Sequence, residues 1–419
     1  MKKLIAALTF SALLFCGFAE EDDDLFDDIF NEETDIESPL VTEPVKTPLE
    51  KIMPKKISFS GSLNADMGFL YTLDPNGATP EEMHKPRGFF DIENTFYINA
   101  RPADIFSVKA SIYTAIQNRF ILELKELYFD YNPFPFLYIT AGKREIKWGY
   151  VRLFSDKDFY NPGTSSSGSE NKYGNNYSGT MYTNLMIDSK GQLSLQLTFP
   201  WSSGSATLLA LYNINNLGNS FASLDIKDLS FAASIEQTFW HTSVNLFMRT
   251  YGQKEMINNN SEQVHKRPTL GIEAKRTVFK ADLYAQELIR VADFKNLNHS
   301  SGYERNILTL GAYRKWDFNV CDFGINAEYQ FQYAFTEKAS THLTAVDAGV
   351  SKLGPKQNMK VGVAWNQNYS ENSGDVSLVF QVSKLIPFAD IKNVLQFYYA
   401  NNKLTNFQAG ITLYVNCGY

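Results

Sequence analysis

Apolar and polar residues alternate along this chain from Ile57 onward. In the first run, Ile57, Phe59, Leu63 and Met67 occupy one set of positions, and small or polar residues such as Asp66 occupy the other. Successive side chains of a β-strand point to opposite faces, so a period of two predicts a strand with one apolar and one polar face. The pattern recurs to the end of the chain, for example across 321–332 and 407–415.

The length of the runs and the lengths of their connections separate a membrane barrel from a soluble β-sandwich. Many runs last about ten residues or more, which exceeds the usual soluble strand and suits a tilted crossing of a hydrocarbon layer. Tight turns alternate with long polar loops, which is typical of bacterial outer-membrane barrels. The predicted tight turns are 101–104, 132–135, 188–191 and 353–356, and the predicted long loops are 74–86, 148–179, 253–266 and 293–302.

The periodicity predicts twenty strands between 57 and 415. The runs between 179 and 226 are short, so eighteen or sixteen strands also fit, and all four long loops fall on the outer side only if 221–226 is counted as a strand. Backbone amides in hydrocarbon have no water to bond, so the first strand must pair with the last. The predicted fold class is therefore all-β: a closed antiparallel transmembrane β-barrel with an even number of strands, about 16–20.

The first residues differ from the rest. Residues 1–19 combine a basic start, an apolar run and small residues at the end, which predicts a secretory signal peptide cleaved after Ala19. Bulky Leu14 and Phe15 disfavour the alternative of a lipoprotein at Cys16. Residues 20–55 are acidic and contain prolines, which predicts a disordered periplasmic tail. The barrel is expected over 56–419, in a bacterial outer membrane.

Composition and motifs exclude several classes of function. The net charge is −7 without a basic stripe, so no nucleic-acid partner is expected. No mature segment is long and apolar enough for a membrane helix. Outside the leader, Cys321 and Cys417 form neither a disulfide framework nor a metal cluster. The chain has no P-loop, HExxH, CxxC or GxSxG motif in a usable context, so we predict no cofactor, no metal site and no catalytic residue.

The polar faces of the predicted strands carry charges of both signs, which would line a pore and steer solutes. Mixed signs without a basic ladder argue against a dedicated phosphate channel. The predicted pore-lining residues are the acidic Asp66, Asp91, Glu93, Glu236, Glu273 and Glu328 and the basic Arg101, Lys109, Arg249, Lys275 and Arg290.

Residues 142–162 end one predicted strand, 136–147, and open the longest polar loop. Trp148 suits a girdle at the membrane surface, and Gly149 allows a sharp turn. A turn at Asp158, Asn161 and Pro162 would fold the loop back. The loop either enters the lumen and narrows it or lies over the outer rim.

The same segment resembles one found in several porin-like families of Gram-negative outer membranes. Its pattern is Gly-(Arg/Lys)-x-x-(Ile/Val)-x-Trp-Gly followed by Asp-x-x-Asn-Pro. The matching residues, in about a twentieth of the chain, are Gly142, Lys143, Ile146, Trp148, Gly149, Asp158, Asn161 and Pro162. The resemblance implies a passive channel or uptake barrel.

The last predicted strand carries a second resemblance. Gln408-x-Gly410-x-x-Leu413-x-Val415 is similar to the signal by which outer-membrane barrels are recognised for assembly, although four residues follow Val415. It implies the barrel assembly machinery as a partner, beside outer-membrane lipid. A homo-oligomer is left open.

Three hypotheses of function follow. The first is a channel through which small hydrophilic solutes diffuse or are taken up. The alternative is a structural or adhesive surface barrel with a plugged lumen, whose loops 148–179 and 253–266 bind a ligand. The third, a barrel hydrolase, requires a histidine beside catalytic partners. The five histidines sit in loops, turns or strand ends: His84, His241, His265, His299 and His342.

Overall fold

The structure is a computed structural model that describes residues 57–75, 79, 83–116, 120–144, 146, 149–154, 192–212, 227, 229–252, 268–297, 299–354, 356, 358–386 and 389–418. The predicted signal peptide and acidic tail lie outside these residues and stay predictions.

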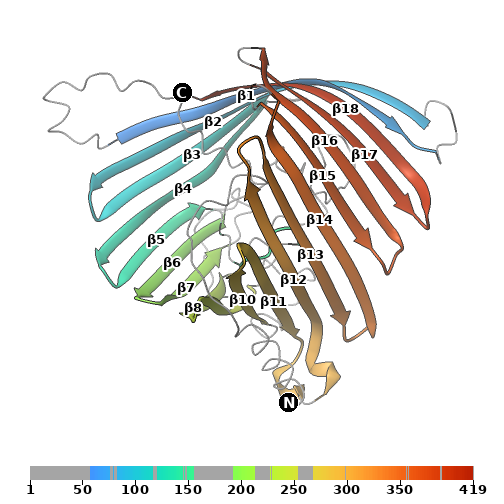
Figure 1. Ribbon diagram of the computed structural model, residues 1–419. Helices are drawn as coiled ribbons and strands as arrows, with labels where there is room; N and C mark the ends of the chain where they lie inside the picture. The colour runs from blue at the N-terminus through green and yellow to red at the C-terminus, as the bar shows by residue number, and fades with distance from the viewer. Residues whose placement is uncertain are drawn as a thin grey trace, which may run out of the picture.

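The described residues form eighteen strands in one antiparallel sheet (Figure 1). The strands are β1 Ile57–Leu73, β2 His84–Ala103, β3 Phe106–Ile116, β4 Phe120–Phe134, β5 Leu137–Arg144, β6 Gln192–Trp201, β7 Gly204–Tyr212, β8 Leu229–Phe239, β9 Thr242–Thr250, β10 Thr269–Val278, β11 Ala281–Val291, β12 Tyr303–Asp317, β13 Asp322–Ala334, β14 Ala339–Leu353, β15 Met359–Asn368, β16 Ser373–Ile386, β17 Ala389–Ala400 and β18 Lys403–Gly418.

The sheet closes on itself. Each strand pairs with the next one in the chain, and β18 pairs with β1 along a continuous register that runs from Ser62 opposite Gly418 to Leu73 opposite Phe407. Figure 1 shows the two strands side by side at the top of the view. Closure leaves no unpaired edge, which is the condition for a β-structure to cross hydrocarbon. The predicted fold class is confirmed as a closed antiparallel barrel with an even number of strands.

The described residues form eighteen strands, whereas the sequence pattern predicted as many as twenty. The two extra predicted strands, 179–187 and 221–226, lie outside the described residues. The barrel has no place for either, because β5 pairs directly with β6 and β7 pairs directly with β8. Without these two strands, β6 and β7, which lie between them in the chain, run opposite to their predicted directions, and all the other strands keep theirs. The connections 145–191 and 251–268 therefore start and finish at the same end of the barrel as the connection 74–83.

The two faces of the wall differ as the alternation predicts. On the outer face, large apolar side chains such as Phe59, Phe120 and Leu122 are exposed. On the inner face, polar side chains such as Ser111 and Asn326 are buried. An apolar outer belt around a polar interior is the surface that a bilayer-spanning barrel presents to lipid.

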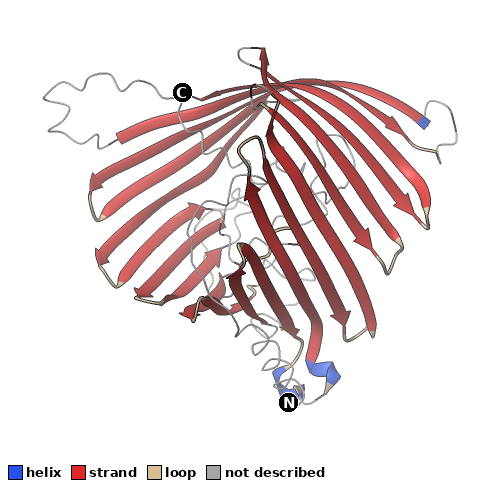
Figure 2. Cartoon of the chain, viewed as in Figure 1, coloured by secondary structure: helices blue, strands red, loops and turns tan. Residues whose placement is uncertain are grey.

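Strands make up the wall, and the helical turns are short (Figure 2). Two 3₁₀ turns, Phe294–Asn296 and Ser300–Gly302, lie between β11 and β12. None of the helices in the described part of the chain has the length and apolarity that a membrane crossing requires.

Candidate functional site

The chain turns into the barrel after β5. Ile146 is buried among inward-facing apolar side chains of β7, β8, β9 and β11. This apolar patch lies on an inner wall whose buried side chains are mostly polar, and burying one isoleucine on it contributes about 1.5–3 kcal/mol. The patch consists of Leu209, Leu211, Ala232, Phe247 and Leu288. It binds Ile146, which precedes residues 149–154 in the chain. We call residues 149–154 the lumen segment.

Gly149 opens the lumen segment with a φ of +102°, a conformation that side-chain-bearing residues rarely adopt. A Cβ atom here would lie 3.0 Å from Nε2 of Gln286 and 3.1 Å from Oε2 of Glu273. Both neighbours are buried on the inner wall. Glycine therefore lets the backbone turn and approach the wall closely.

Glu273 of β10 fastens the first half of the lumen segment. Its Oε2 accepts the backbone N–H of Tyr150 at 3.1 Å and the side-chain amide of Gln286 at 3.1 Å. Its Oε1 accepts the side-chain amide of Asn245 at 3.0 Å. The carboxylate is only 2% exposed. The Tyr150 N–H thus ties the segment to the wall, and the two wall amides, from Gln286 and Asn245, fix the carboxylate and replace the water that it loses.

Glu328 of β13 fastens the second half. Its Oε1 accepts the backbone N–H of Arg152 at 2.6 Å, and its Oε2 accepts those of Leu153 at 2.9 Å and Phe154 at 2.7 Å. The hydroxyl of Tyr284 donates to the same carboxylate. Three successive N–H groups that converge on one anion form a concave anion site, here filled by a side chain of the wall.

Tyr150 adds a side-chain contact. Its hydroxyl donates to Oε1 of Glu236 on β8 at 2.6 Å. Burial of the ring, and then the hydrogen bond to Glu236, raise the pKa of the Tyr150 phenol above its usual value. The phenol therefore stays protonated and remains a donor.

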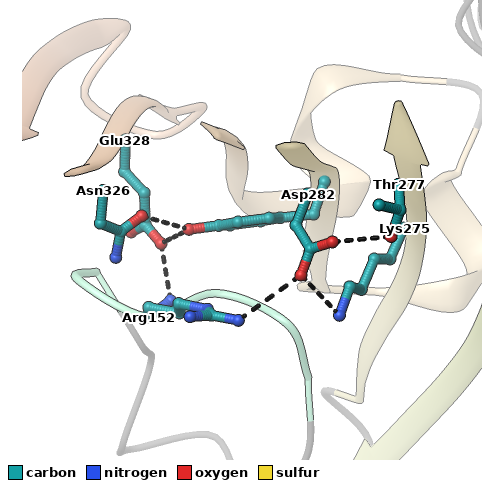
Figure 3. A network of polar contacts seen from close by, with 7 residues as sticks. Arg152, Lys275, Thr277, Asp282, Asn326 and Glu328 are labelled. Atoms are coloured by element: carbon teal, nitrogen blue, oxygen red, sulfur yellow. Dashed lines mark hydrogen bonds and ion pairs between the residues drawn. The ribbon is translucent and has the colours of Figure 1, made fainter. Parts of the chain in front are cut away.

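Charged side chains meet at the lumen segment (Figure 3). Oδ2 of Asp282 lies 2.9 Å from Nζ of Lys275 and 3.8 Å from Nη2 of Arg152. Its Oδ1 accepts the hydroxyl of Thr277 at 2.7 Å. The guanidinium of Arg152 also lies over the Tyr313 ring, 4.1 Å from its centroid. Two cations thus share one carboxylate.

The structure brings four of the predicted pore-lining residues together around the lumen segment, namely Glu236, Glu273, Lys275 and Glu328. The seven others lie elsewhere on the barrel.

On the β1 to β4 side, Asp66 and Asp91 are buried directly opposite each other on β1 and β2, and Glu93 follows on the same face. Lys109 lies 3.3 Å from Asp130. Arg101 is exposed near the end of β2.

Near the outer ends of β9 and β11, the guanidiniums of Arg249 and Arg290 lie against Tyr251, 5.0 and 5.2 Å from its ring centroid. These two basic residues therefore contact one aromatic ring.

Of the residues that mark the loop, Trp148, Asp158, Asn161 and Pro162 lie outside the described residues. Gly149 lies inside the barrel, against the side chains of Glu273 and Gln286. Of the two paths that the sequence leaves open for this loop, residues 149–154 follow the inward one.

The sequence pattern did not single out several residues of the site. Asn245, Asp282, Tyr284 and Gln286 share the inward-facing positions of their strands with predicted residues, so the alternation carried a signal for them. Arg152 follows the end of a strand pattern, where no period indicates which way a side chain points.

Two of the histidines contact tyrosine hydroxyls of neighbouring positions in the wall. The ring of His84 contacts the hydroxyl of Tyr71, and Nδ1 of His342 lies 2.6 Å from the hydroxyl of Tyr329. His265 lies outside the described residues. Within the described ranges, no three His, Cys, Asp or Glu side chains gather as a metal site.

Solved structures share the fold. OccK8 (OprE) of Pseudomonas aeruginosa is similar with a TM-score of 0.51 and 7% identity, over 86% of this chain and 98% of that one. OpdL of Pseudomonas aeruginosa is similar with a TM-score of 0.51 and 9% identity, over 86% of this chain and 99% of that one. No protein-family model matches the sequence, and no curated protein is similar to it. At these identities the similarity establishes the architecture of the barrel.

Proposed function

We propose that this chain is a porin-like channel of a bacterial outer membrane, through which small hydrophilic solutes diffuse or are taken up. The closed barrel with its apolar outer belt supports the location, because such a surface suits a bilayer. The polar inner wall supports passage of hydrophilic solutes. The similarity in fold to OccK8 and OpdL also supports a channel.

One observation carries the proposal: the lumen segment is bound inside the barrel by buried carboxylates. Glu273 and Glu328 each lie near the middle of their strands, so the segment crosses the interior well below the rim. Its hydrogen bonds described above all go to the wall from β8 to β13. A segment tied along one wall narrows the bore from that side.

We further propose that the inward-facing charges line this path. Glu93, beside the buried Asp66 and Asp91, would act on solutes from the wall that faces the lumen segment, and the part-exposed Arg290 would act from the outer end of β11. Arg249 is fully buried and would act on solutes only through its electrostatic field. Charges on a low-dielectric wall change the local concentration of solutes of each sign.

The direct test is conductance in planar lipid bilayers. The purified, folded full-length protein should give discrete conductance steps. Replacing Glu273 and Glu328 together by Gln should enlarge those steps, because the lumen segment loses the carboxylates that hold its backbone along the wall. A folded barrel that inserts and stays silent would overturn the proposal and favour the structural or adhesive alternative.

The remaining assignments belong to the same proposal. The barrel acts without catalysis, cofactor or metal, and its lipid-facing surface contacts the outer membrane. Recognition by the barrel assembly machinery and association into a homo-oligomer stay predictions.

A further inference from the structure

The carboxylates that hold the lumen segment are turned away from water. Glu273 and Glu328 are each 2% exposed, and their oxygens accept backbone N–H groups of the segment. Two cations beside them reach solvent further than the neighbouring Asp282 does. Arg152 is 30% exposed and Lys275 is 32% exposed, whereas Asp282 between them is 13% exposed.

The negative charge of Asp282 is compensated without Arg152. Lys275 contacts one of its oxygens at 2.9 Å, and Thr277 donates to the other at 2.7 Å. Arg152 is the looser partner, with Nη2 at 3.8 Å from Asp282. Its guanidinium can therefore exchange Asp282 for another anion without leaving a carboxylate unpaired.

Arg152 is nevertheless held in position. Its backbone N–H is bonded to Glu328, and its guanidinium stacks over Tyr313. Stacking occupies one face of the planar group, whose edges carry more N–H donors than the contacts with Asp282 and Tyr313 use, so donors remain for a carboxylate or phosphate. Figure 3 shows Arg152 on the loop between Glu328 and Asp282, which come from strands on either side.

We propose that Arg152 is the specificity-determining residue of the channel: its guanidinium binds the anionic group of a solute at the level of the lumen segment, in exchange for Asp282. This inference rests on the proposed channel. Lys275 remains paired with Asp282 while the solute is bound. Asp282 limits the attraction, since it competes with the solute for Arg152.

The test is the reversal potential of single channels in a salt gradient. Arg152→Gln should lower the anion permeability by about fivefold, the effect of one unit charge on a monovalent anion at roughly 4 Å in water, and should lower the anion-to-cation permeability ratio at least as much. Asp282→Asn should raise the ratio, because both cations lose their shared carboxylate. Arg152→Lys should prefer the same sign of ion, anion or cation, as the wild type. Lys338→Gln removes an exposed charge in the turn between β13 and β14 and is the matched control.

The outcomes separate this inference from the channel itself. Conducting variants of Arg152 and Asp282 whose reversal potentials equal that of Lys338→Gln would overturn the role of Arg152 and leave the channel standing. A folded wild-type protein without conductance would overturn both. If Asp282→Asn does not fold, Arg152→Gln and Arg152→Lys decide alone.

Discussion

The backbone N–H of Arg152 donates to Oε1 of Glu328 at 2.6 Å, although 176 positions separate the two residues in the chain. The contact joins the connection after β5 to the far side of the β8 to β13 wall. It is the reason to regard residues 149–154 as a fixed part of the interior.

Glu328→Gln should loosen the lumen segment. The amide keeps one acceptor oxygen but turns an NH₂ group toward N–H groups that the carboxylate accepted, and each hydrogen bond to a charged group contributes about 1.5–3 kcal/mol. We expect a larger and noisier single-channel conductance. Glu337→Gln, in an exposed turn, should conduct like the wild type. Equal currents from both variants would show that Glu328 does not hold the segment.

Gly149→Ala tests the entry into the barrel. A methyl group would meet the side chains of Gln286 and Glu273 at about 3 Å, on a backbone with φ of +102°. A strained backbone of this kind costs on the order of 1–3 kcal/mol, so the segment should shift and the open-channel current should fluctuate more. Gly88→Ala is the control, because the nearest atom to its new Cβ lies 4.0 Å away. Steady, wild-type currents in Gly149→Ala would contradict the close approach.

Tyr150 should not ionise in the range of an ordinary tyrosine. Its raised pKa favours the protonated form, so this contribution to stability is present below about pH 10 and is lost only as the pH rises through the higher pKa of the folded state. Between about pH 9 and 11, folded wild type and Tyr150→Phe should gain equal tyrosinate absorbance. In denaturant they should differ by one tyrosine. A difference of one tyrosine between the folded proteins near pH 10 would refute the buried hydrogen bond to Glu236.

Met67→Arg tests the lipid-facing belt. Met67 is an exposed outward residue near the middle of β1, and arginine at the bilayer midplane costs about 2–4 kcal/mol. Phe59→Arg, on the same face but near the end of the strand, should cost about 0–1 kcal/mol. The measurement is the free energy of folding into lipid vesicles by denaturant titration. Equal, small costs at both positions would mean that β1 does not cross a bilayer.

The sequence by itself determined the strand character of the chain, the two faces of its strands and the need for closure. The side-chain period of a strand is two, so Asp66 and Met67 are assigned to opposite faces without any knowledge of neighbours. The closed edge follows because hydrocarbon offers no hydrogen bonds to a free backbone. The same alternation predicted that Glu273 and Glu328 lie on the inner wall.

Only the tertiary structure decided which of those inner residues meet and what occupies the space between them. The strand number became eighteen through the direct pairing of β5 with β6 and of β7 with β8, a question of register that periodicity does not address. The inward path of residues 149–154 depends on Glu273 and Glu328, which lie more than a hundred positions away along the chain. Such contacts depend on the curvature of the closed wall, and a local pattern of residues carries no information about it.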